Sequence, residues 1–315
     1  MIKLNQDNLA EIKKTNLIKK INKSIKIAVM DDKGLYDYQY NYIKTPLELK
    51  YKQQSHGAPV CNVLYELAQD FLPNLEIYYF NKTNEAKDYI IKNNIPIVCC
   101  SFYNGVKSQM LEELKEHTLL VCSSGNSADS YNGADNHYPA AYNDTLSVGA
   151  YIEEIDKPAS YSDGGSTLDL VGFTNIYVKN SKLEYFPFSG TSAAAPYISF
   201  MLIYSIAASL VSSNKQDLIN FALNNCIDVH TLGIDNKTGR GLFKLPDLPE
   251  KKELDFIYQS DGTYKVFVDD NEINFNGNPP QFINSKLLMP LREILEELGH
   301  TVNWYNDTKN AKVIE

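Results

Sequence analysis

The chain has 315 residues, which is enough for one large domain and one small one. Hydrophobic residues make up 43% of it and charged residues 22%, as in ordinary globular proteins. The formal net charge of −9 disfavours nucleic acid as a partner, because phosphate binding requires clustered lysine and arginine. No apolar run approaches the ~20 residues of a membrane-spanning helix, so membrane insertion is not expected.

The N-terminal segment, residues 1–24, is polar and carries an amphipathic helical pattern over residues 7–22. It lacks the apolar core of a secretory signal. We therefore expect a cytoplasmic protein in which this segment is a helical extension or a short leader, although export by another route stays open. The five cysteines are odd in number and lie mostly in apolar contexts, which favours buried free thiols in a reducing compartment. No Cys/His spacing suggests zinc, and no cofactor is expected.

Short apolar strands alternate with helical patterns from residue 25 to about residue 230. Strands are expected at residues 25–30, 75–80 and 95–101, from residue 118, and at 145–150 and 168–171. Helices are expected at residues 55–70, 83–93, 110–116, 193–210 and 215–224. This alternation predicts an α/β fold, a doubly wound, mainly parallel sheet with helices on both faces. In such sheets, chemistry gathers at the carboxyl ends of the strands.

Two titratable residues stand at the first strand end and the first helix start. Asp31 follows the strand at 25–30 directly and precedes a glycine turn. His56 stands just ahead of a helix whose entry is shaped by Gly57 and Pro59. Taken alone, an aspartate that only opens a turn and a histidine that caps a helix or lies on the surface are the favoured interpretations.

Two further polar residues occupy a turn and a helix start. Asn126 lies in a glycine-containing turn after the strand from residue 118, where it could donate a side-chain N–H or be an ordinary turn residue. Ser192 lies among small residues at 190–196, ahead of a strongly apolar helix whose N-terminus contributes positive potential. We expect Pro196 in the first helical turn, where its missing N–H costs little. The alternative is a Gly/Ser turn that caps a core helix.

The four residues have complementary chemistry. Ser192 would be a nucleophile, which requires a base within hydrogen-bond reach. His56 would take its proton and return it to the leaving amine, and Asp31 would hold the imidazole and stabilise its cation. Asn126, with the backbone N–H of Ser192, would bind the oxyanion of a tetrahedral intermediate.

In this order and in these contexts the sequence resembles the subtilisin-like serine proteases, the subtilases of peptidase family S8. The likeness is carried by residues 27–31, 56–57, 124–126 and 190–196, with lesser echoes at 138–140 and 239–242. It covers residues 25–247, the expected catalytic domain. It implies a subtilisin-like fold and a serine endopeptidase that hydrolyses peptide bonds of proteins through an acyl-enzyme. The alternative is a catalytically silent binding or regulatory protein of the same fold.

The sequence also departs from the family pattern. The Thr and the second His that usually follow His-Gly are Ala58 and Pro59 here. Asp31 is followed by Asp32, so the orienting acid could be either; Asp31 is favoured because it follows the apolar run directly. The segment between His56 and the strand at 75–80 is short, so the calcium loop of many relatives is not expected. Residues 1–24 are too few for the long folding propeptide of secreted relatives.

Substrate recognition is expected on two segments that line a cleft by resemblance. These are Ser101, Phe102 and Tyr103, and Ser123, Ser124 and Gly125. Their backbone would pair with an extended peptide as an added strand. His137 lies either near the floor of the pocket for the P1 residue, which supplies the acyl group, or on a solvent-facing loop, and the loop is favoured.

The C-terminal part differs in pattern from the rest. A Pro-rich, charged linker is expected at residues 248–256, followed by a small α+β domain at 257–315. Its pattern predicts a hairpin at 264–273, a strand and a helix at 287–299, and strands at 301–305 and 311–314. Residues 289–292, 298–299 and 302–304 resemble the copper amine oxidase N-terminal-like domain. No copper is implied, because His300 has no partner ligand nearby in the sequence, and we expect a docking domain for a protein partner.

Overall fold

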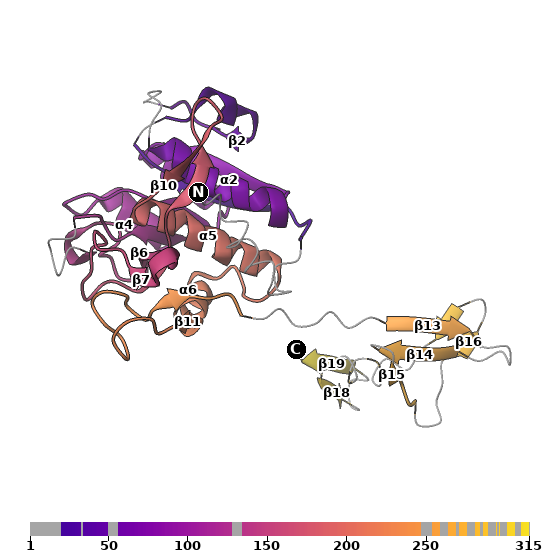
Figure 1. Cartoon of the computed structure of the whole chain (residues 1–315). Coiled ribbons are helices and arrows are strands. Elements are labelled where there is room, and N and C mark those ends of the chain that lie inside the picture. Colours follow the sequence, from indigo (N-terminus) through magenta and orange to yellow (C-terminus); the bar gives the residue numbers. More distant parts are fainter. Residues whose placement is uncertain are drawn as a thin grey trace. The chain divides into compact units, whose positions relative to one another are not determined.

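The computed structural model of the chain (Figure 1) divides into two compact units, Met1–Leu248 and Pro249–Glu315. The structure describes residues 20–32, 34–49, 56–127, 134–246, 254–258, 264–268, 271–275, 281–283, 286–288, 294, 296, 301–305 and 310–314. The helix predicted over residues 7–22 falls almost wholly outside this range, and residues 20–22 are not helical.

The first unit is built on a ten-stranded sheet. In spatial order its strands are β11 (Cys226–Ile227), β12 (Leu242–Phe243), β8 (Leu170–Phe173), β6 (Leu146–Ile152), β5 (Leu119–Ser123), β4 (Ile97–Cys100), β1 (Ile25–Met30), β3 (Leu75–Phe80) and β2 (Ile43–Lys44). From β12 to β2 all neighbours are parallel, whereas β11 and the short β7 (Lys157–Pro158) pair antiparallel with β12 and β6. The predicted, mainly parallel sheet is confirmed.

Helices cover both faces of this sheet, as predicted. One face carries α2 (Gly57–Phe71), α5 (Thr191–Ala207) and α6 (Lys215–Asn224), and the other carries α3 (Asn84–Lys92) and α4 (Gln109–Lys115). Because successive strand side chains point to opposite faces, β1 contributes to two cores: Ile27 and Val29 pack with α2 and α5, and Ala28 and Met30 pack with α3 and α4. The strands are therefore apolar on both sides, which made them visible in the sequence.

The helix that begins at Thr191 is buried along its whole length. Pro196 is its sixth residue, so the expectation that it lies in the first turn is wrong. Proline has no N–H to offer the carbonyl four residues earlier, which is that of Ser192. The hydroxyl of Ser101 donates to this carbonyl instead, at 3.1 Å.

Several elements of the first unit were not predicted. The largest is an antiparallel hairpin formed by β9 (Ile176–Lys179) and β10 (Tyr185–Phe188), which leads directly to the Ser192 turn. Only its Ile176, Val178 and Phe188 are buried, so the apolar signal is short and interrupted. Three 3₁₀ helices were also missed: η1 (Asp37–Asn41), η2 (Ala134–Asn136) and η3 (Glu153–Ile155).

The second unit consists of small antiparallel sheets. They are β13 (Leu254–Tyr258) with β14 (Tyr264–Val268) and β15 (Asn271–Glu272), β16 (Gln281–Ile283) with β17 (Lys286–Leu288), and β18 (Thr301–Tyr305) with β19 (Asn310–Ile314). Val266, Ile273, Phe275 and Ile294 form a small apolar core. Strand β13 begins inside the range expected to be linker, because it pairs with β14 along its whole length. In the described part of the chain, no helix combines the length and the apolar character needed to cross a membrane.

Candidate active site

The polar residues singled out in the sequence gather at one edge of the parallel sheet. Asp31 follows β1, Ser101 follows β4 and Ser124 follows β5, three neighbouring strands. His56 and Ser192 stand at the N-termini of α2 and α5, the helices that cover the same face. This is the strand edge at which open α/β sheets form their sites.

Asp31 holds the imidazole of His56. Its Oδ2 lies 2.8 Å from His56 Nδ1, and the two side chains are 4% and 36% exposed. The other carboxylate oxygen accepts the backbone N–H of Asp32 at 2.7 Å. With Nδ1 donating to Asp31, the tautomer that follows leaves Nε2 as the basic nitrogen.

The structure separates the roles of Asp31 and Asp32. The Asp32 side chain is half exposed and pairs with Lys82 at 2.7 Å, away from the imidazole. Lys82 also donates to Asn104 at 3.1 Å and lies 4.3 Å from the ring centroid of Phe102. Lys82 therefore supports the segment after β4, a role that no local sequence pattern indicates.

Two aromatic rings lie next to the His56–Gly57 dipeptide, one against each residue. Phe188, at the end of β10, meets the imidazole edge to face at a centroid distance of 5.9 Å. Tyr79 of β3 lies against Gly57, where a Cβ would overlap the phenol, so the residue after His56 must be glycine. The Tyr79 hydroxyl is buried, and within the part of the chain that the structure describes it has no hydrogen-bond partner. Burial raises the pKa of this phenol far above its usual range, which keeps it neutral beside Asp31.

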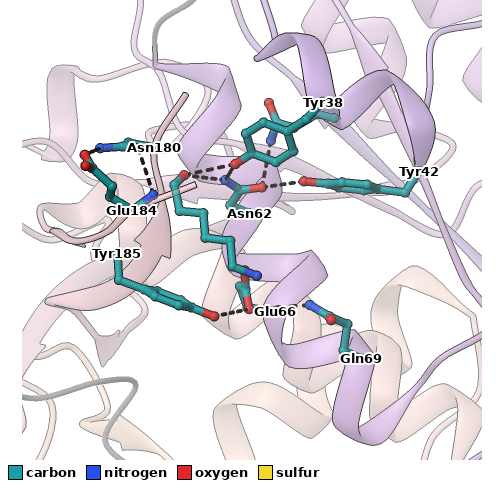
Figure 2. A network of polar contacts seen from close by, with 10 residues as sticks. Tyr38, Tyr42, Asn62, Glu66, Gln69, Asn180, Glu184 and Tyr185 are labelled. Atoms are coloured by element: carbon teal, nitrogen blue, oxygen red, sulfur yellow. Dashed lines mark hydrogen bonds and ion pairs between the residues drawn. The ribbon is translucent and has the colours of Figure 1, made fainter. Parts of the chain in front are cut away.

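A buried polar network fixes α2 against the rest of the site (Figure 2). Asn62 donates to the carbonyl of Lys179 on β9 at 2.7 Å and to the hydroxyl of Tyr38 at 2.8 Å. Its carbonyl oxygen accepts from Gln39 at 2.8 Å and from Tyr42 at 2.9 Å. All four hydrogen-bonding positions of this amide are thus used, and they join α2 to the η1 region and to the β9–β10 hairpin.

Ser192 lies on a turn that several groups hold in place. The Gly190 N–H donates to Tyr161 at 3.1 Å and its carbonyl accepts from Thr174 at 3.0 Å. Gly190 has a φ of +94°, a left-handed backbone that favours glycine. The Ser192 hydroxyl donates to the carbonyl of Ser101 at 3.3 Å, and its hydrogen bonds within the described residues do not include His56.

Thr191 orients the amide of Asn126. The Asn126 Oδ1 accepts from the Thr191 N–H at 2.8 Å and from its hydroxyl at 3.1 Å. Both partners are donors here, so the carbonyl side of the amide faces Thr191 and the NH₂ side is left for another acceptor. Asn126 is exposed to solvent.

Comparison with known proteins agrees with this architecture. The sequence profile of the subtilase family matches residues 50–241, more than half of the chain. The chain belongs to the subtilase family. By class it is a subtilisin-like serine endopeptidase, whose substrates are proteins or peptides. The profile of the copper amine oxidase N-terminal domain matches residues 267–315. A search of curated protein sequences returned no match.

Solved structures with the same fold are distant in sequence. The prenylagaramide maturation protease PagA aligns with a TM-score of 0.61 at 16% identity, over 74% of this chain and 95% of PagA. The self-cleaved protease domain of PatA aligns with a TM-score of 0.58 at 17% identity, over 72% and 95%. A cold adapted subtilisin-like serine proteinase aligns with a TM-score of 0.57 at 18% identity, over 71% and 89%. At such identities the likeness shows the fold of this subtilase.

The six residues expected to line the cleft differ in how open they are. Ser101, Ser123, Ser124 and Gly125 are buried, Phe102 is half-buried, and Tyr103 is 60% exposed. The hydroxyl of Ser124 donates to the carbonyl of Asp163 at 2.9 Å, and that of Ser101 bonds Ser192. These two serine side chains are therefore buried and bonded to backbone carbonyls of the protein. Tyr103 is the residue of the six that faces solvent.

His137 does not lie on a solvent-facing loop, so the interpretation favoured from the sequence is wrong. Its side chain is 14% exposed, and Nδ1 lies 2.8 Å from the carbonyl of Ser124. The sequence missed this placement because a histidine before Tyr138 carries no local burial signal, and the partners lie elsewhere in the chain.

The cysteines of this subtilase are all free, and four of the five are buried. Burial raises the pKa of the Cys99 thiol to about 12 and that of Cys61 far above its usual range, so both stay protonated near the site. Within the described residues, no three His, Cys, Asp or Glu side chains are grouped so that they could hold a metal ion.

Proposed function

We propose that this subtilase hydrolyses peptide bonds through an acyl-enzyme on Ser192, with His56 as general base, Asp31 as its orienting acid and Asn126 in the oxyanion hole. The contact between Asp31 and His56 carries the proposal. A buried carboxylate 2.8 Å from Nδ1 fixes the imidazole and stabilises its protonated form, which is the task of the acid in such a triad.

The chemistry then follows from the residues around Ser192. His56 Nε2 removes the hydroxyl proton as the oxygen attacks the carbonyl carbon of the substrate. The negative charge that develops on the carbonyl oxygen is met by the NH₂ of Asn126 and by the Ser192 N–H at the start of α5. Protonation of the leaving amine by His56 gives the acyl-enzyme, which water hydrolyses by the same route.

The resting hydroxyl of Ser192 points to the carbonyl of Ser101. Catalytic hydrogen bonds are often long or misaligned without substrate and tighten when it binds, so this arrangement is compatible with a working base. The alternative is a catalytically silent subtilase that binds peptides without cutting them. The hydrogen bond of the Ser192 hydroxyl to Ser101, in place of one to His56, is the observation that favours it.

A fluorophosphonate probe distinguishes the two functions. An assembled triad attacks the phosphorus, expels fluoride and leaves Ser192 covalently labelled. We expect mass spectrometry to place the label on Ser192 of the wild-type protein, and labelling to be lost in Ser192→Ala and His56→Ala. Casein hydrolysis should follow the same pattern. A folded wild-type protein that is neither labelled nor active would overturn the proposal and favour the silent alternative.

The oxyanion assignment has its own test. Asn126→Ala should lower kcat by about 10²–10³-fold with little change in KM, the size of effect known from a subtilisin that lost this donor. Exposed Asn220→Ala, on α6, is the matched control and should leave both constants near wild type. An Asn126→Ala enzyme with normal kcat would contradict the assignment.

A further inference from the structure

A buried pair of titratable side chains lies directly behind the oxyanion turn. Gly125, the residue before Asn126, has a φ of +117°, and a Cβ on it would overlap both the imidazole of His137 and the carboxylate of Asp163. The space that a side chain at 125 would occupy is therefore filled by these two groups. Neither group takes part in the chemistry proposed above.

His137 is held rigidly in this position. Its Nδ1 lies 2.8 Å from the carbonyl of Ser124, which can only accept, so Nδ1 carries the proton. Asp163 Oδ2 lies 3.4 Å from the same nitrogen, close enough for electrostatic attraction, but the N–H is directed at Ser124, and Oδ2 has no hydrogen-bond partner among the described residues. The Asp163 side chain is fully buried, and its Oδ1 accepts the N–H of Ser127 at 3.1 Å. The attraction between this buried carboxylate and the Nδ1–H group holds the imidazole of His137 in place.

The other face of the imidazole is covered by Tyr103. The two rings stack with centroids 4.4 Å apart and planes 23° apart. The backbone secures this pairing, because Asn104 and Tyr138, the next residues on each side, exchange hydrogen bonds of 2.6 and 3.0 Å. His137 thus spans the gap between the segment after β4 and the end of β5, and stacked rings at this spacing leave no room for a third group between them.

This gap is where the P1 side chain of a substrate must go. The attacked carbonyl has to meet the Ser192 hydroxyl, which lies against Ser101, and its oxygen has to meet the Asn126 amide, which follows Gly125. The P1 side chain branches from the Cα atom that is bonded to that carbonyl carbon. It therefore enters between the 101–103 and 123–125 segments, the two that His137 bridges.

We propose that His137 and Tyr103 are specificity-determining residues that close the P1 pocket, so that this enzyme selects glycine, alanine or serine at P1, with Asp163 as the positioning residue that holds His137. The inference rests on the proposed function, since it concerns the substrate of the same site. A larger P1 side chain would have to displace the stacked rings and expose the buried carboxylate, which disfavours its transition state.

The test compares fluorogenic peptides that differ only in carrying alanine or phenylalanine at P1. The wild-type enzyme should prefer alanine. Tyr103→Ala and His137→Ala should each raise the phenylalanine-to-alanine ratio of kcat/KM by about 10-fold or more, since pocket volume changes of this kind discriminate by at least that factor. Tyr40→Ala, which removes an exposed tyrosine from η1, is the control and should leave the ratio unchanged.

Tyr103→Ala keeps the test decisive even where His137→Ala, by stripping Asp163 of its neighbour, fails to fold. A wild-type preference for phenylalanine, or an unchanged ratio in folded Tyr103→Ala, would overturn the inference. Fluorophosphonate labelling of Ser192 does not depend on P1, so labelling together with an unchanged ratio would refute the closed pocket alone. A folded wild-type protein that shows neither labelling nor hydrolysis would overturn the proposed function, and with it the inference about the P1 pocket.

Discussion

Ser101 and Pro196 act as a pair on the backbone of Ser192. Proline at 196 leaves the Ser192 carbonyl without its helical partner, and the Ser101 hydroxyl takes that place at 3.1 Å. The Ser192 hydroxyl in turn donates to the Ser101 carbonyl. The end of β4 and the start of α5 are thereby joined at Ser192 by two reciprocal hydrogen bonds.

This pairing predicts a non-additive effect on stability. Ser101→Ala should lower the free energy of unfolding by about 1–3 kcal/mol, because it leaves a buried carbonyl unpaired. In a Pro196→Ala background the restored N–H can bond that carbonyl, so the same Ser101→Ala change should cost clearly less. Urea unfolding of the four proteins measures the coupling. Equal costs of Ser101→Ala in both backgrounds would contradict the pairing.

Asp169 makes stability depend on pH in an unusual direction. Its carboxylate accepts the Ser147 N–H at 2.8 Å, yet burial raises its pKa from 3.8 to about 6, more than Arg240 and that hydrogen bond lower it. Between these two values the folded protein binds the proton more tightly than the unfolded chain does. Its contribution to stability is therefore present below pH 4 and is lost as the pH rises through 6.

Asp169→Asn keeps the acceptor for Ser147 and removes the titration. As the pH rises from 4 to 7, the wild-type protein loses the contribution of Asp169 and the variant does not. The unfolding free energy of the variant minus that of wild type should therefore rise by on the order of 2 kcal/mol, from about 1.4 kcal/mol per unit of pKa shift. Chemical denaturation at the two pH values measures this difference. A difference between variant and wild type that does not change with pH would refute the raised pKa.

At the scale of elements, the site depends on how three chain segments meet. The η1 region follows Asp31, α2 begins after His56, and the β9–β10 hairpin precedes Ser192. The amide of Asn62, a residue of α2, bonds to the η1 region and to the hairpin (Figure 2). The network extends outward through Glu66, which pairs with Lys179 and accepts from Tyr185. The relative position of Asp31, His56 and Ser192 is thus set partly by one buried side chain.

Asn62→Leu keeps the approximate shape and removes all four hydrogen bonds. We expect the free energy of unfolding to fall by on the order of 3 kcal/mol, because several buried partners lose their bonds together. We also expect kcat to fall, because α2 loses its anchor to the hairpin. Gln69→Ala, at the exposed rim where its bond to Glu66 is 3.4 Å long, is the control and should change stability by less than about 0.5 kcal/mol. Asn62→Leu with the stability and kcat of the control would contradict this role.

At the scale of the whole molecule, the features that could be predicted are those with a local sequence signal. The features that were missed depend on contacts between residues far apart in the sequence. The sheet strands carry apolar side chains on both faces, and the helices between them have clear periods, so the doubly wound fold was readable. Asp31 and Ser192 stand at element boundaries with local sequence signals. The contact of His137 with Asp163, by contrast, joins two residues that lie far apart in the sequence, and the sequence around neither residue indicates the contact. The β9–β10 hairpin was missed because its apolar pattern is short and interrupted. Its packing against the rest of the first unit, and not an alternation of apolar and polar residues in its own sequence, specifies these strands.

The division into two units leads to a prediction for a chain that lacks the second unit. Each unit has its own apolar core: the sheet and its helices in the first, and Val266, Ile273, Phe275 and Ile294 in the second. Every residue assigned to the site belongs to the first unit. A chain that ends after Leu248 should therefore fold and be labelled by a fluorophosphonate on Ser192 at about the rate of the full chain. Much faster labelling of the shortened chain would assign an inhibitory role to the second unit. A folded but unlabelled fragment would mean that the second unit is required to complete the site, against the separation of cores from which the prediction is drawn.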